Sequence, residues 1–138
     1  MKALQCLILG ALAVAVSDSA AAAEPAADAA AVTALMTKDL VGVPGKEVVM
    51  LTVGYLPGGA SLPHRHEAQV FVYVLEGSII TQVDGQPPKT LKAGETFYES
   101  PQDIHRKSAN ASTTQAAKFL VFMIKDKNKP ASIPVPAG

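Results

Sequence analysis

Short runs of apolar residues, many of them β-branched or aromatic, recur along the chain from about residue 46 onward. The runs QVFVYVLE at 69–76 and AKFLVFMI at 117–124 are apolar at both odd and even positions. Strands with this pattern are typical of a sheet covered on both sides. We therefore expect two buried strands here, with one face of their sheet shielded by a second copy of the chain in a homodimer.

Further strands are expected at 46–56, 78–85 and 89–100, because glycine or proline punctuates almost every junction between them. The segment VTALMTKDL at 32–40 fits either a short helix or an edge strand, since its apolar spacing does not decide between the two. Many short strands with tight turns, and no convincing long helix, predict an all-β fold of antiparallel strands arranged as a sandwich or barrel.

The first 23 residues have the composition of a secretory signal. Lys2 precedes a mostly apolar run, and a stretch of small residues ends in the cleavage pattern Ala21-Ala22-Ala23. We predict cleavage before Glu24 and export to the periplasm or the medium. An uncleaved membrane anchor is the alternative, although the apolar run is short for crossing a bilayer.

The remaining chain is predicted to form one domain. The alanine-rich residues 24–31 are expected to be a disordered leader, residues 32–128 the β-domain, and the proline-rich residues 129–138 an extended tail. The sole cysteine, Cys6, lies in the signal, so the exported part has no disulfide. Stability must then come from a packed core, with help from a metal or a second subunit.

Charge excludes some classes of partner. Lysine plus arginine, 12 residues, equals aspartate plus glutamate, also 12. A neutral chain exerts no long-range attraction on nucleic acid or on an anionic membrane surface. We expect no nucleic-acid partner and, after signal cleavage, no membrane partner. The predicted partner is a small molecule.

The candidate chemistry lies in three histidines, which are all that the chain contains. His64 and His66 occur in PHRHEAQV at 63–70, and His105 follows far along the chain. Side chains alternate across a strand, so His64 and His66 point to the same side. Neutral imidazoles bind divalent transition metals, and we predict one such ion at these residues. Iron is preferred, while zinc, nickel, copper or manganese also suit the ligands.

The spacing of these residues resembles that of the cupin superfamily. Gly58 stands before five residues and then His64, Gly77 closes the same motif, and Gly94 stands eleven residues before His105. The resemblance covers about residues 40 to 125. It implies a single-domain cupin β-barrel of jelly-roll type, with His64, His66 and His105 as metal ligands inside the barrel, and it supports a homodimer.

One position departs from the family pattern. The glutamate ligand of cupins falls on Val70, and a valine cannot bind metal. Gln69 could take its place as a weak fourth ligand, and Glu67 is another neighbour that could do so. Glu99, near the second motif, is a candidate general acid or base. Arg65 is expected to make a structural ion pair.

The residues leave more than one function open. The first hypothesis is an exported metalloenzyme, in its concrete form a mononuclear iron dioxygenase of a small anionic, phenolic or diketone compound. The second is a non-catalytic cupin that binds a small molecule or a metal, for example as a sensor. A degenerate cupin that has lost its metal is the third, and the valine at position 70 is its best support. Fold alone does not choose between them.

Overall fold

The computed structural model describes residues 29–136, and in that range it consists of strands joined by turns. The predicted signal at 1–23 and most of the predicted leader lie outside the described residues. The strands are β1 (Ala30–Asp39), β2 (Lys46–Tyr55), β3 (Ala60–Ser61), β4 (His64–Arg65), β5 (Ala68–Glu76), β6 (Ser78–Val83), β7 (Lys89–Lys92), β8 (Thr96–Glu99), β9 (Ile104–Asn110), β10 (Ala117–Asp126) and β11 (Ile133–Pro134).

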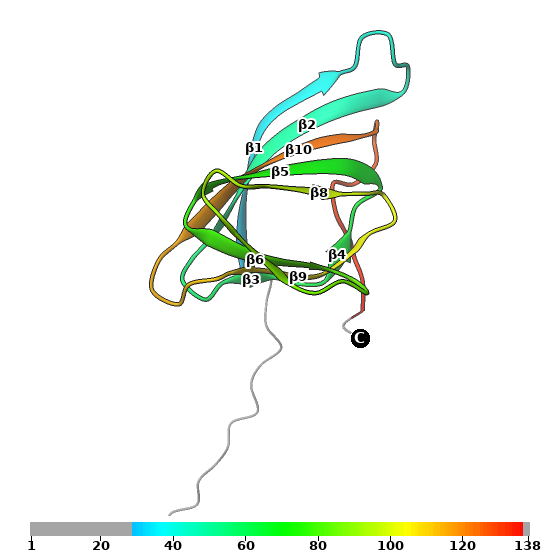
Figure 1. The fold of residues 1–138 in the computed structure, drawn as a ribbon. Coiled ribbons are helices and arrows are strands. Elements are labelled where there is room, and N and C mark those ends of the chain that lie inside the picture. The colour runs from blue at the N-terminus through cyan, green and yellow to red at the C-terminus, as the bar shows by residue number, and fades with distance from the viewer. Residues whose placement is uncertain (1–28, 137–138) are drawn as a thin grey trace, which may run out of the picture.

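The strands form two antiparallel sheets that face each other (Figure 1). One sheet has the order β1-β2-β10-β5-β8, and the other has the order β11-β4-β9-β6-β7, with β3 also paired to β9. The predicted all-β, antiparallel jelly-roll architecture is confirmed, although the two sheets are not joined edge to edge into a closed barrel. Neighbours such as β5 and β10 are far apart in sequence, so pairing across the chain shapes the interior.

The strand at 69–76 alternates between buried and exposed positions. Val70, Val72 and Val74 point into the core, whereas Phe71 and Tyr73 are 43% and 45% exposed. The expectation that this strand is covered on both faces is therefore wrong for a single chain. A homodimer would cover this apolar outer face, and it stays a prediction.

The two ends of the described chain differ from the boundaries predicted from composition. Strand β1 begins at Ala30, two residues before the predicted start of the domain, and it is an edge strand rather than a helix. The predicted tail contributes β11, which pairs with β4 through Ile133 and Arg65. The described residues include no helix long and apolar enough to cross a membrane.

Candidate metal centre

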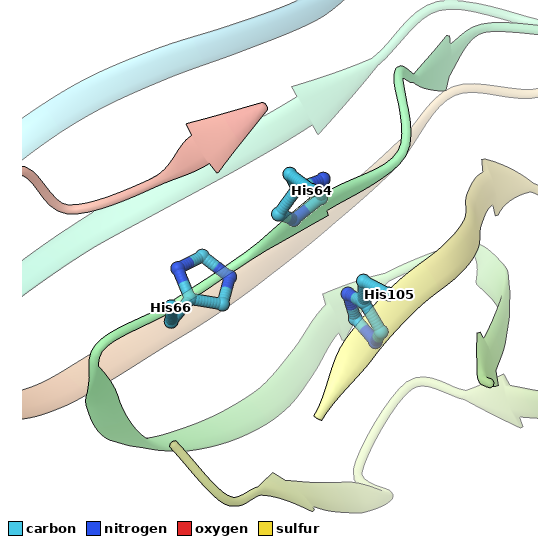
Figure 2. Close-up of side chains that lie close together, drawn as sticks. All are labelled: His64, His66 and His105. Carbon is cyan, nitrogen blue, oxygen red and sulfur yellow. The ribbon is translucent and has the colours of Figure 1, made fainter. Parts of the chain in front are cut away.

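Strand pairing brings the three histidines together. In the β4–β9 pair, His64 lies directly opposite His105. His66 follows β4 by one residue and projects to the same side as His64, as the alternation along an extended chain predicts. Figure 2 shows the three rings gathered between these two segments.

The rings are close enough to share one ion. Their centroids are 4.9 Å apart for His64 and His66, 5.4 Å for His64 and His105, and 6.5 Å for His66 and His105. One nitrogen of each ring lies within 4.8 Å of the corresponding nitrogens of the other two. Metal–imidazole bonds are about 2.1 Å long, so the three nitrogens would draw somewhat closer together on binding one ion. The predicted group of His64, His66 and His105 is present, and it can hold a metal.

Hydrogen bonds to the backbone orient two of the rings. His64 Nδ1 lies 2.7 Å from the carbonyl oxygen of Leu62, and His66 Nδ1 lies 2.5 Å from that of Ala131. A carbonyl oxygen only accepts, so each Nδ1 carries the proton and donates. The Nε2 atoms of both rings are left as unprotonated donors for a metal, which is the arrangement found around metal-binding histidines.

His105 is held in the opposite sense. Its Nε2 lies 2.8 Å from the hydroxyl oxygen of Thr81, and the ring of Phe97 stacks on it at a centroid distance of 5.7 Å. Because Nε2 of His105 is engaged by Thr81, Nδ1 is the nitrogen available to a metal. Thr81 and the carbonyl of Ala131 were not identified from sequence, since neither belongs to a motif.

Burial favours the neutral form of His105 and His66. It lowers the pKa of His105 to about 3, with the nearby His64 and His66 adding to the effect. Burial is also the main cause that lowers the pKa of His66, against the hydrogen bond to Ala131. Since metals bind the unprotonated ring, these two histidines are ready to bind an ion over the whole range around neutrality.

The histidines line a mostly apolar cavity of about 150 Å³. A cavity of this size is comparable with one that accommodates benzene, so a ligand of about six non-hydrogen atoms fits beside the imidazoles. A second polar group in the wall is Tyr55, whose hydroxyl lies 2.6 Å from the Ser61 hydroxyl and 2.9 Å from that of Ser108. Lysine and arginine are absent from the described residues that line the cavity.

Two residues considered as replacements for the missing carboxylate lie elsewhere. Gln69 is exposed on the outer face of β5, because side chains alternate and its neighbour Val70 points inward. Glu67 is also exposed and forms a 3.3 Å ion pair with Arg65. The structure brings neither Gln69 nor Glu67 to the three histidines, and Arg65 makes the structural ion pair expected of it.

Glu99, in contrast, lies at the histidines. It ends β8, is 3% exposed, and has an Oε2 atom 3.3 Å from His105 Nδ1 and 3.7 Å from His66 Nε2. Burial, reinforced by the charge of Asp103, raises the pKa of Glu99 to about 8. The sequence singled out this residue by its closeness to the second motif, and its role as an acid or base stays a prediction.

These pKa shifts predict how the stability of metal-free protein depends on pH. Between 4.5 and about 8, Glu99 holds a proton in the folded state that the unfolded chain has lost, so stability falls as pH rises through this window. Below 6.5, His105 and His66 bind protons in the unfolded chain and not in the fold, so stability falls as pH falls. In the pH range where both effects act, the two histidines change the stability more than the single carboxyl group does. The free energy of unfolding is therefore expected to be largest near pH 6.5.

Urea unfolding of chelator-treated protein at several pH values checks this expectation. From pH 6.5 to 8 the free energy of unfolding should fall by about 1 kcal/mol, because Glu99 gives up half of its proton by pH 8 and the histidines of the unfolded chain still hold some protons just above pH 6.5. The variant Glu99→Gln should lose this alkaline decline and keep the acid one. A wild-type protein equally stable at pH 6.5 and 8 would contradict the prediction.

Comparisons with known proteins agree with this geometry. Residues 51–123 match the family model described as Cupin domain. A search among curated proteins finds no match. Among solved structures, an oxalate oxidase in complex with the substrate analogue glycolate is 25% identical, with a TM-score of 0.59. The alignment covers 79% of this chain and 62% of that one, so the chain spans less than two thirds of that protein's length.

Two other solved structures share the fold at lower identity. A cupin-like protein from Thermotoga maritima MSB8 is 21% identical with a TM-score of 0.60, over 77% of this chain and 75% of that one. The DMSP lyase DddQ from Ruegeria pomeroyi DSS-3 is 20% identical with a TM-score of 0.63, over 80% of this chain and 54% of that one. At these identities the likeness concerns the fold alone.

Proposed function

Because the chain belongs to the cupin family, we propose that it binds one divalent transition-metal ion through His64, His66 and His105 and acts there on a small molecule. The preferred version is a mononuclear iron dioxygenase of a small organic acid, phenol or diketone. The observation that carries the proposal is the convergence of three imidazoles, each with one nitrogen within 4.8 Å of the others and each with one nitrogen engaged in a hydrogen bond. Imidazole nitrogen suits iron, zinc, nickel and copper alike.

The cavity supports a small, oxygen-bearing substrate. Its volume of about 150 Å³ leaves space for a molecule of about six non-hydrogen atoms. The structurally similar oxalate oxidase has been solved with glycolate, which is a hydroxy acid of this size class. When bound, a transition metal supplies Lewis acidity and, in the case of iron, one-electron chemistry. The apolar wall would exclude bulk water, and the Tyr55 hydroxyl group, held by Ser61 and Ser108, would offer the substrate a polar contact.

Elemental analysis of protein purified without an affinity tag tests the metal first. We expect close to one transition-metal ion per chain, and oxygen uptake by iron-loaded protein with at least one member of a panel of hydroxy acids, phenols and diketones. Metal-free protein loaded with zinc serves as the control, since zinc binds the same ligands without redox chemistry. If fully iron-loaded protein takes up no oxygen with any member of the panel, the dioxygenase hypothesis is wrong.

A non-catalytic binding cupin is the second candidate, and the apolar lining of the cavity favours it. Among the described residues of the wall, Glu99 is the only carboxylate, and no lysine or arginine is present to handle protons or anions. A stoichiometric metal that binds glycolate or catechol and turns over nothing would support this version. Isothermal titration of the loaded protein with these compounds measures it.

Export and self-association complete the proposal. The signal-like residues 1–23 support cleavage before Glu24, and mass spectrometry of protein from the periplasm or medium should then find a chain that begins at Glu24. The exposed side chains of Phe71, Tyr73 and Tyr98 on the outer face of β5 and β8 support a homodimer. Analytical ultracentrifugation that detects only monomer would remove the dimer.

A further inference from the structure

The carboxylate missing from position 70 has a counterpart on the neighbouring strand. Strands β5 and β8 pair antiparallel, and Val70 lies directly opposite Glu99. Side chains of directly opposed residues share one face of the sheet, with Cβ atoms about 5 Å apart. Both side chains line the cavity and both are buried. A carboxylate on β8 at position 99 therefore enters nearly the same space as one on β5 at position 70.

The carboxylate of Glu99 also faces the nitrogens that a metal would use. Its Oε2 atom is 3.3 Å from Nδ1 of His105 and 3.7 Å from Nε2 of His66. These are the nitrogens left over after Thr81 and Ala131 engage the other side of each ring. The carboxylate of Glu99 is therefore within reach of an ion bound by these two nitrogens.

The charges around Glu99 also support a metal beside this residue. An ionised carboxylate in an apolar cavity is costly unless a cation compensates it. The described residues that line the cavity include no lysine or arginine. A divalent metal ion would supply the positive charge that this environment lacks.

We propose that Glu99 is a metal ligand, so that the centre has three imidazoles and one carboxylate. The carboxylate comes from position 99 of β8 instead of position 70 of β5. The inference rests on the proposed metal function. It replaces the acid or base role of Glu99, and it changes the substrate preference. A divalent ion with this ligand set carries one net positive charge instead of two, which favours a monoanionic ligand over a dianionic one.

Cobalt binding measures this ligand directly, because Co²⁺ absorption in the visible range reports the donor set as well as the affinity. We expect Glu99→Gln to weaken Co²⁺ at least roughly 10-fold, since even residues that only support a ligand cost that much, and to shift the visible absorption bands. The matched control is Glu67→Gln, which removes an exposed carboxylate adjacent to His66 in sequence. This variant should keep the wild-type affinity and spectrum.

A ligand relocation supplies the second test. Glu99→Val should lose affinity as Glu99→Gln does, and the double variant Glu99→Val with Val70→Glu should regain it, because the carboxylate returns to the same space from β5. Circular dichroism verifies that each variant is folded. If the double variant does not fold, the affinity and spectrum of Glu99→Gln decide by themselves.

The outcomes separate this inference from the proposed function. If wild-type protein binds Co²⁺ and Glu99→Gln retains both its affinity and its spectrum, Glu99 is not a ligand and the acid or base role returns. If the wild-type chain binds no Co²⁺, the proposed metal function fails, and this inference fails with it. If Glu99→Gln loses Co²⁺ affinity and the double variant regains it, Glu99 is established as a ligand.

Discussion

Replacing His105 with alanine is expected to weaken Co²⁺ binding by about 100-fold or more and to abolish the stabilisation that the metal confers. Structural metal sites with four ligands are worth about 10–16 kcal/mol, so one ligand accounts for about 3 kcal/mol. A factor of ten corresponds to about 1.4 kcal/mol. His105 is buried and supplies the ligand that comes from the second half of the chain. Without it, His64 and His66 are a two-residue site on one segment.

Competition against a chromophoric chelator gives the affinity, and thermal unfolding with and without Co²⁺ gives the stabilisation. Wild-type protein at 100 times its dissociation constant should gain about 2.7 kcal/mol from the metal. The control is Ser61→Ala, which alters the same cavity wall but leaves the histidines and the Tyr55–Ser108 hydrogen bond in place. If His105→Ala retained wild-type affinity while remaining folded, the assignment of the ligands would be wrong.

Gly77→Ala is expected to destabilise the fold by about 3 kcal/mol, the largest effect on stability of any glycine substitution in the described chain. A Cβ atom at Gly77 would lie 2.5 Å from the carbonyl oxygen of Ala116 and 3.0 Å from Cα of Ala117. Gly77 has φ of +68°, which costs a residue with a side chain roughly 1–2 kcal/mol. The overlap with backbone atoms, which cannot rotate away, adds roughly 1–3 kcal/mol.

Gly85→Ala is the matched control for this effect. Its φ of +72° is nearly the same, but nothing lies within 4 Å of the added Cβ atom. The control should therefore lose only the conformational part, about 1–2 kcal/mol. Urea unfolding of the two variants separates the steric from the conformational cost. Equal losses in Gly77→Ala and Gly85→Ala would show that the close approach of Ala116 is not what makes Gly77 necessary.

Both predictions concern residues that the sequence motifs single out, and both effects come from contacts between distant segments. Gly77 joins β5 to β6, and its close approach to Ala116 lets β10 pair tightly beside β5. The same β5–β10 pairing, with β8 on the other side of β5, carries Val70 to its place opposite Glu99. The strand junction and the metal centre therefore depend on a single sheet register.

The sequence by itself determined the fold class and identified the three histidines that could hold a metal. Apolar runs separated by glycine and proline are local signals, and they predicted the strands at 46–56, 69–76, 78–85 and 117–124 that the structure contains. The two-residue spacing of His64 and His66 is also local, because alternation along an extended chain places both on one side. The position of His105 was predicted from the motif resemblance, and the β4–β9 pairing agrees with it.

Only the tertiary structure decided what surrounds these ligands. Proximity along the chain suggested Gln69 or Glu67 as the replacement for the missing carboxylate, and it gave Glu99 only an acid or base role. The approach of Glu99 to the histidines depends on the register of β5 against β8, and register is set by packing of whole sheets rather than by neighbouring residues. The contacts of Thr81 with His105 and of the Ala131 carbonyl with His66 likewise depend on the tertiary structure. Composition predicted an extended tail around Ala131, whereas in the fold the carbonyl of Ala131 orients the ring of His66.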